Sequence, residues 1–153
     1  MEPYQDYVEL LQAFNAARVR YLLVGALAVS HYTQPRYTKD MDVWIEPTPR
    51  NAERVFRCLV KYGASMERAT PKDFSVKGTV FQIGVEPVRI DVITDIAGLR
   101  FSPAWSKRKK IKFGPAWANI VGLDDLVRAK RASGRPQDKI DVEHLLLNKK
   151  RKR

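Results

Sequence analysis

The chain has 153 residues, of which 44% are hydrophobic and 10% aromatic, and this composition is typical of a folded globular protein with a single core. Its one cysteine, Cys58, excludes an internal disulfide and a four-cysteine zinc site. The formal net charge of +11 favours a polyanionic partner, either nucleic acid or nucleotide phosphates.

The positive charge is concentrated in two places. The last five residues, 149–153, are all basic, and a second basic cluster occupies residues 107–112. The start of the chain lacks a signal-peptide profile, and no apolar run reaches the length of a membrane span. We therefore expect a cytoplasmic protein.

Apolar periodicity and turn residues predict the elements in chain order. They are a helix over residues 3–18, a buried strand over 20–26, a helix over 27–33, a strand over 42–46, a helix from Pro49 to about Tyr62, strands over 78–84 and 88–94, an irregular basic segment over 95–110, a short edge hairpin over 111–120, and helices over 122–134 and from Pro136 onward. This order predicts an α+β (mixed α/β) fold, with a small mixed β-sheet flanked by helices. We expect a single domain over residues 1–147 and a basic, disordered tail over 148–153.

The stretch TKDMDVWIE, residues 38–46, places two acidic residues at the mouth of an apolar strand. Asp40 and Asp42 are two residues apart, so both side chains point to the same face of the strand. At about 6 Å, two such carboxylates repel each other by roughly 3 kcal/mol at an effective dielectric constant of about 20. An Asp-x-Asp pair alone usually belongs to a turn or a solvated surface. A bound cation between the two carboxylates is the alternative.

Two further residues favour the cation. Asp91 lies between Ile90 and Val92 in an apolar strand, where an unpaired buried charge is prohibitively costly. Gly25 follows a buried strand and precedes a helix, so backbone amides at the helix start can face an anion. If the strands are neighbours, three carboxylates meet beside a phosphate-binding helix end and form a Mg²⁺ (or Mn²⁺) site.

The pattern of strand, Gly25-Ala26, helix, Asp40-Met41-Asp42-Val43 and a later strand with Asp91 resembles the minimal nucleotidyltransferase superfamily of the DNA polymerase β type. TKDMDVWI and the ending LDDLVRAKRASGRPQDKIDVEHL resemble bacterial stand-alone nucleotidyltransferase-like proteins, including toxin-type relatives. The resemblance covers residues 20 to 147. At Ala26 the chain departs from the family pattern, which has glycine or serine there, so a hydroxyl that could touch a phosphate is absent.

The resemblance implies a role for each matching residue. Asp40 and Asp42 would bind the metal and, through it, a nucleoside triphosphate such as ATP. Asp91 would complete the metal site and could act as general base toward an acceptor hydroxyl. Gly25 and Ala26 would let the backbone approach the phosphates, although a tight turn without a ligand also explains Gly25.

Several basic residues could hold the triphosphate. Arg36 and Lys39 flank the acidic pair, where charge balance is the alternative explanation. Lys130 and Arg135 could reach the phosphates from the C-terminal helices. Asp138 and Asp141, three residues apart on the last helix, could orient them or simply be solvated. The tryptophans are interpreted as core or edge packing rather than base-stacking platforms; they are Trp44, Trp105 and Trp117.

The resulting hypothesis is a Mg²⁺-dependent nucleotidyltransferase that moves a nucleoside monophosphate from an NTP to an acceptor hydroxyl and releases pyrophosphate. The acceptor could be RNA, such as a tRNA end recruited by residues 107–112 and 149–153, a protein side chain or a small molecule. Family analogy adds an antitoxin-like protein as a partner. The alternatives are a non-catalytic nucleic-acid-binding module on the same fold and a partner-binding protein that docks through its basic tail.

Overall fold

The computed structural model describes residues 5–34, 40–84 and 88–151. Its helices are α1 (Gln5–Ala16), α2 (Gly25–Tyr32), α3 (Pro49–Tyr62), α4 (Phe101–Ser106), α5 (Leu123–Ser133) and α6 (Pro136–Arg151), with a 3₁₀ helix η1 (Pro71–Ser75). Its strands are β1 (Tyr21–Val24), β2 (Asp40–Ile45), β3 (Val80–Ile83), β4 (Arg89–Ile93), β5 (Lys109–Phe113) and β6 (Ala116–Ile120). The predicted α+β class with a mixed sheet is confirmed.

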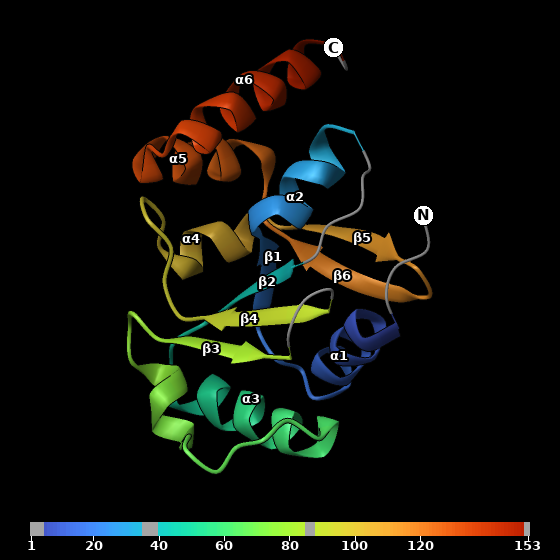
Figure 1. Cartoon of the computed structure of the whole chain (residues 1–153), viewed down its shortest axis with the longest axis vertical. Coiled ribbons are helices and arrows are strands. Elements are labelled where there is room, and N and C mark those ends of the chain that lie inside the picture. Colours follow the sequence, from blue (N-terminus) through green and yellow to red (C-terminus); the bar gives the residue numbers. More distant parts are fainter. Residues whose placement is uncertain (1–4, 35–39, 85–87, 152–153) are drawn as a thin grey trace.

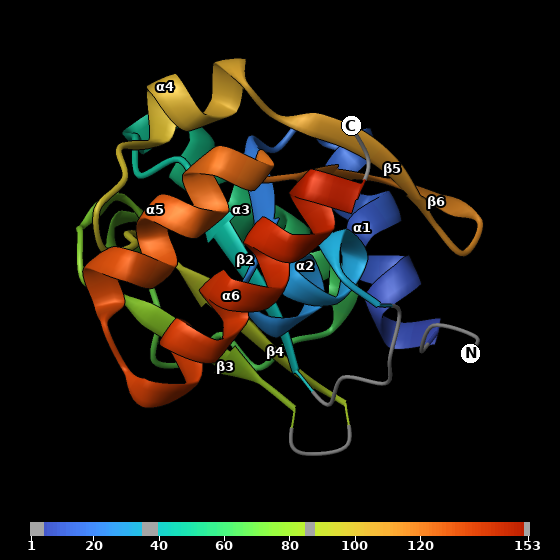
Figure 2. The same cartoon turned by 90° about the horizontal axis from the view of Figure 1, so that it is seen from above.

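The six strands form one sheet in the order β3-β4-β2-β1-β6-β5. Strands β1 and β6 are parallel, as are β2 and β4, whereas β1 and β2 are antiparallel. Helices α2, α5 and α6 gather where β1 ends, and α1 and α3 lie at the opposite side of the sheet (Figures 1 and 2). The carboxyl end of β1 and the amino end of β2 therefore meet beneath the C-terminal helices.

Local sequence accounts for the ends of the helices. The Thr48 hydroxyl accepts a hydrogen bond from the Asn51 amide at the start of α3, Pro49 occupies the first turn, and Gly63 ends the helix in the left-handed conformation. The core is built from the apolar faces of α1 and α3 and from strands β1 and β2. All four residues of β1, Tyr21–Val24, are buried.

Two sequence predictions are wrong in part. The segment expected to be irregular contains α4, because Phe101 and Ala104 are buried and the Phe101 ring contacts Trp44 at 5.0 Å between centroids. Residues expected to begin a disordered tail continue α6 through Arg151. Asn148 donates to the Tyr32 carbonyl and Lys149 pairs with Asp124 at 2.7 Å, so this last turn is anchored.

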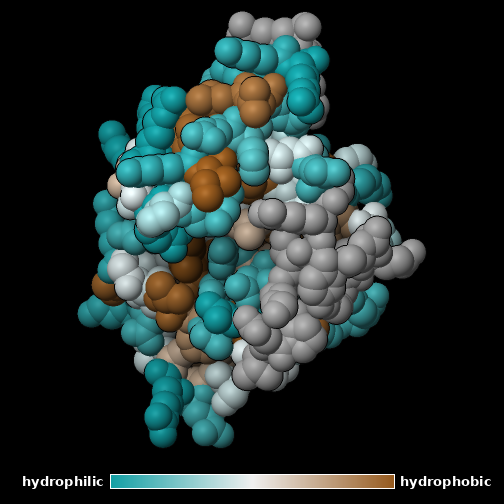
Figure 3. All heavy atoms as spheres, turned by 45° about the horizontal axis from the view of Figure 1, so that its top comes forward, coloured by the Kyte–Doolittle hydropathy of each residue, from teal (hydrophilic) through white to brown (hydrophobic). Residues whose placement is uncertain are grey.

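The surface around the C-terminal helices is largely hydrophilic, with apolar side chains scattered among the polar ones (Figure 3). On α6, the exposed large apolar residues are Ile140 and Leu147. Within residues 5–34, 40–84 and 88–151, no helix combines the length and the apolar character that crossing a membrane requires.

Candidate active site

The turn from β1 into α2 brings a helix N-terminus against an acidic side chain. Gly25 begins α2 with φ +69°, and a Cβ added there would lie 2.1 Å from Asp42 Oδ2. No side chain caps this helix, because the N-cap residue is Val24. The backbone amides of the first turn, including that of the exposed Ala26, are thus left for another acceptor.

Strand register brings the three predicted aspartates together. Asp42 lies opposite Asp91 in the parallel pair of β2 and β4, and opposite Val24 in the antiparallel pair of β2 and β1. Asp40 is on the same face of β2, two residues earlier. Asp91 is only 7% exposed, as expected for an aspartate flanked by core residues. The two strands are therefore neighbours, as the prediction required, and Asp42 and Asp91 share a register position.

Arg89 is a member of this cluster that the sequence analysis did not identify. Its Nη2 donates to Asp91 Oδ2 at 2.9 Å and its Nε to Asp91 Oδ1 at 3.3 Å. Its Nε also lies 3.8 Å from Asp40 Oδ1. A buried carboxylate beside two other acids needs a compensating cation, and Arg89 supplies it through this bidentate pair.

A second charged cluster joins α5 to α6. Lys130 Nζ lies 3.2 Å from both Asp138 Oδ1 and Asp141 Oδ2, and Arg135 Nε lies 2.9 Å from Asp138 Oδ2. The prediction that the two aspartates orient the two basic residues is confirmed. Burial raises the pKa of Asp138, but hydrogen bonds from Arg135, Ser133 and Lys130 outweigh it and hold this pKa well below its usual range.

The C-terminal cluster acts electrostatically on the carboxylate cluster. The charge of Lys130 favours the ionised form of Asp42, and the charge of Asp42 in turn favours the protonated guanidinium of Arg135. Both basic residues therefore lie within electrostatic range of the candidate site. Arg36 and Lys39 fall outside the described residues.

Three solved structures with a similar arrangement of elements are an adenylyltransferase, a putative nucleotidyltransferase and a nucleotidyltransferase-like protein. The chain superposes on a lincosamide antibiotic adenylyltransferase with lincomycin bound (TM-score 0.62, 14% identity, covering 95% of this chain and 97% of that one). It also superposes on a putative nucleotidyltransferase from Thermotoga maritima (TM-score 0.62, 12% identity, covering 92% and 89%). A third match is an antigenic nucleotidyltransferase-like protein from Paracoccidioides brasiliensis (TM-score 0.54, 14% identity, covering 93% and 73%).

The chain has the nucleotidyltransferase fold. Sequence comparison alone does not detect this, since no protein-family model matches the chain and no curated protein is significantly similar to it. The agreement with the solved structures extends over almost the full length of the chain.

A divalent cation such as Mg²⁺ commonly accompanies triphosphate substrates. Asp42 and Asp91 lie in register on neighbouring strands, and Asp40 lies two residues earlier on β2 with its Oδ1 buried and without a hydrogen-bond partner. Carboxylate oxygens of this kind suit a hard cation. As the side chains stand, the described residues include no group of three or more acidic, histidine or cysteine side chains arranged to hold a metal ion. Arg89 instead pairs with Asp91 and lies 3.8 Å from Asp40.

The acidic cluster changes the protonation of Asp42. Burial, with the added charges of Asp91 and Asp40, raises the pKa of Asp42 to about 6 from its ordinary value of 3.8. A raised pKa in the folded state means that ionisation of this group weakens folding. Stability contributed by Asp42 is thus fully present below about pH 4 and is lost as the pH rises toward 6.

We expect Asp42→Asn to stabilise the metal-free protein at pH 7, by up to about 2–3 kcal/mol, since one pKa unit corresponds to about 1.4 kcal/mol. At pH 4 the variant and the wild type should unfold at similar denaturant concentrations. Urea unfolding at the two pH values in EDTA measures both differences. The exposed Asp95→Asn is the control, and an equal gain for both variants would contradict a specific effect of Asp42.

Tyr7 is another residue of this region that the sequence did not single out. Its hydroxyl donates to the Arg89 carbonyl at 3.2 Å, and burial, with smaller contributions from Asp40 and Asp42, raises its pKa to about 12. Arg89 could have been identified from the sequence, because it stands two positions before Asp91 on a strand and so lies on the same face as Asp91. Tyr7 left none, since it belongs to the regular apolar stripe of α1.

Proposed function

We propose that this chain is a divalent-metal-dependent nucleotidyltransferase that transfers a nucleoside monophosphate from an NTP to an acceptor hydroxyl and releases pyrophosphate. The observation that carries the proposal is the register of Asp42 opposite Asp91, with Asp42 against the first residue of α2 in a nucleotidyltransferase fold. This register supports the proposal because it would bring metal-binding oxygens and phosphate-binding amides close together.

Asp40, Asp42 and Asp91 would hold Mg²⁺ or Mn²⁺, after Arg89 turns away from Asp91. The bound cation would neutralise charge on the triphosphate and polarise its phosphoryl oxygens. Asp42 must be ionised to serve as a ligand, and its pKa of about 6 leaves it mostly ionised at neutral pH. The charge of a cation would lower this pKa further.

Phosphate binding is assigned to the amides at Gly25 and Ala26 and to basic side chains. The start of α2 offers uncapped amides to an anion. Lys130 would supply positive charge from α5 and Arg135 from the residue preceding α6. Arg36 and Lys39, which lie outside the described residues, remain predicted contributors of further charge. Lys130 is held by two buried aspartates and therefore acts through its field and its fixed position more than as a mobile donor.

In the transfer step, the acceptor hydroxyl oxygen attacks the α-phosphorus while the bond from that phosphorus to the bridging oxygen of the β-phosphate breaks. Pyrophosphate carries away the bonding electron pair, and Asp91 takes the hydroxyl proton. The acceptor is an RNA end, a protein side chain or a small-molecule hydroxyl. The lincomycin-bound structural neighbour supports including small molecules among the candidates.

The test is transfer of label from each α-³²P-labelled NTP in turn with Mg²⁺, in the presence of total RNA, cell protein or a small-molecule panel that includes lincomycin. We expect label on one acceptor class with the wild type and with Asp95→Asn. We expect none with the double variant Asp40→Asn/Asp42→Asn, which keeps shape but removes two ligand charges.

The proposal would be overturned if no acceptor were labelled and if the affinity for NTP were the same with and without Mg²⁺ and in the double variant. In that outcome the fold would serve a binding function without catalysis. Thermal unfolding of the double variant is measured in parallel, because a folded but inactive protein is the informative result.

A further inference from the structure

A cavity of about 850 Å³ lies at the opposite end of the sheet from the carboxylates. Its walls come from the end of α1 and the following loop, from α3 and α4, and from the β5–β6 hairpin. Strand β1 starts at Tyr21 beside this cavity and ends at Val24 beside Asp42. The two sites therefore occupy opposite ends of the same central strand. We call this cavity the basic groove.

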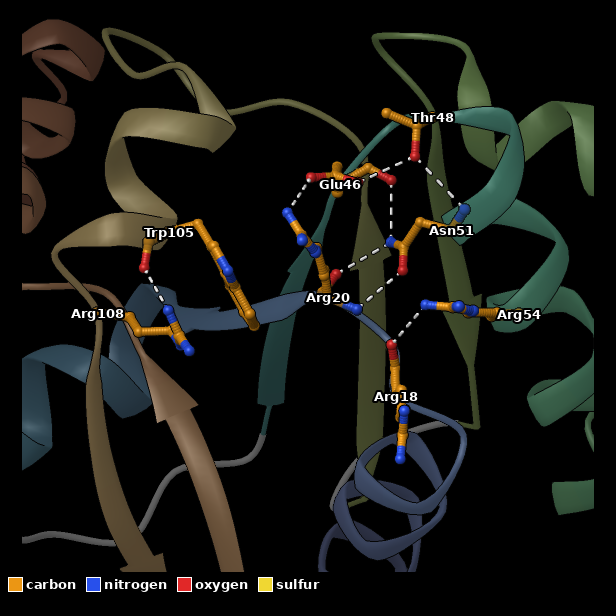
Figure 4. Close-up of polar contacts among 8 residues, drawn as sticks. All are labelled: Arg18, Arg20, Glu46, Thr48, Asn51, Arg54, Trp105 and Arg108. Carbon is orange, nitrogen blue, oxygen red and sulfur yellow. Dashed lines mark hydrogen bonds and ion pairs between the residues drawn. The ribbon is translucent and has the colours of Figure 1, made fainter.

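The lining of the basic groove is strongly cationic. It contains Arg18, Arg20, Arg54, Arg108 and Lys110, and the described lining residues include no aspartate or glutamate. Arg20 pairs with Glu46 just outside the lining, at 3.3 Å. Figure 4 shows that Arg54 and Arg108 donate instead to backbone carbonyls, those of Arg18 at 3.2 Å and Trp105 at 2.9 Å. These contacts orient the guanidinium groups without cancelling their charge.

Trp105 holds two of these arginines in place. The guanidinium carbon of Arg108 lies 3.8 Å from the centre of the indole ring, and that of Arg20 lies 5.6 Å from it. Figure 4 shows the indole between the two arginine side chains. The expectation that Trp105 packs rather than stacks on bases agrees with this arrangement.

Trp117 differs from the expectation of packing, because it is 55% exposed. It lies on β6 opposite Lys112, whose Nζ is 4.6 Å from the centre of the indole ring. Lys110 and Lys112 are two apart on β5, so both share this face of the hairpin. The amide side chain of Asn15 donates to the Trp117 carbonyl at 2.7 Å and so ties this strand to α1.

We propose that the basic groove binds single-stranded nucleic acid. Four of its five cations are arginines, whose planar guanidinium groups suit phosphate oxygens. The exposed indole of Trp117 offers a face for a base, and a groove with spaced positive charges beside an aromatic ring is typical of single-strand binding. An acidic peptide would match the charge but would offer no aromatic ring to stack on this indole. The inference does not depend on the proposed nucleotidyl transfer.

The test uses the full chain, without metal or NTP, and fluorescein-labelled 12-nucleotide oligouridylate and oligothymidylate in anisotropy titrations between 50 and 200 mM KCl. If all five groove cations contact phosphates, the plot of log affinity against log salt should have a slope of about −3.5, because each contact contributes roughly −0.7 on single strands. Arg54→Gln/Lys110→Gln should reduce the steepness by about 1.4. Trp117→Ala should weaken binding at least about fivefold, whereas Trp117→Phe should retain most of it.

The matched control is Arg68→Gln/Lys72→Gln, which removes the same charge at two exposed positions outside the groove. It should bind like the wild type, and so should Asp40→Asn/Asp42→Asn, because the carboxylates lie at the other end of β1. Equal losses in the control and groove variants would overturn the proposal. So would tighter binding of an oligoglutamate peptide than of the oligonucleotides, or equal binding of a 12-base-pair duplex that Trp117→Ala leaves unchanged.

Discussion

Replacing Gly25 by alanine is expected to destabilise the protein by more than about 2 kcal/mol. At φ +69° any residue with a Cβ has a conformational cost of about 1–2 kcal/mol. The added Cβ would also lie 2.1 Å from Asp42 Oδ2, so either the carboxylate or the start of α2 has to move. Urea unfolding measures the loss of stability. The affinity for Mn²⁺ measures whether the Asp42 carboxylate has been displaced.

Gly78→Ala separates the two contributions. Gly78 also has a positive φ, +87°, but nothing lies within 4 Å of its added Cβ. This variant should lose only the conformational part, about 1–2 kcal/mol. Gly25→Ala in an Asp42→Ala background should fall close to this value, because Oδ2 and Cγ of residue 42 are gone and only its Cβ, at 3.1 Å, remains near the added methyl group. An equal cost for Gly25→Ala in both backgrounds would show that Asp42 does not restrict this position.

Lys130→Met is expected to cost about 3 kcal/mol of stability, because breaking a buried ion pair leaves an uncompensated charge. The side chain of Lys130 is 11% exposed, and those of Asp138 and Asp141 are 1% and 7% exposed. In the variant, Asp138 still forms its ion pair with Arg135, and Asp141 still accepts a hydrogen bond from Gln137. The expected cost is therefore at the lower end of the usual range.

The pH dependence gives this prediction a second readout. Because the pKa of Asp138 is depressed in the folded state, its contribution to stability is present above about pH 4 and is lost as the pH falls. Without Lys130, acid unfolding should begin at a higher pH. Arg57→Met, which removes an exposed pair with Glu53, should change stability by less than about 0.5 kcal/mol. A Lys130→Met protein as stable as this control would contradict a structural role for the ion pair.

The sequence predicted the carboxylate cluster because its signals are local. Asp-x-Asp at the start of an apolar strand and an aspartate inside another strand are each visible in a few residues, and the sheet register then brings Asp42 opposite Asp91. Gly25 was recognisable as a turn, but its contact with Asp42 was not, since that contact depends on the antiparallel pairing of β1 and β2.

The parts that escaped prediction depend on tertiary packing. Helix α4 has only six residues and no cap signal, so its burial against Trp44 decides its conformation. The last turn of α6 depends on contacts with Tyr32 and Asp124, far away in the sequence. The basic groove combines cations from residues 18 to 110, and only the 107–112 portion forms a visible run of charge.

The candidate site draws on residues from most of the length of the chain, and this has a consequence for its assembly during synthesis. Lys130 is fixed by Asp138 and Asp141 on the final helix, whereas Asp40 and Asp42 belong to an early strand. At roughly 5–20 residues per second, translation delivers the final helix about 5–20 s after the early strand. A nascent chain therefore carries its acidic pair for seconds without the fixed lysine that offsets it, and the complete site forms only after α6 has been synthesised.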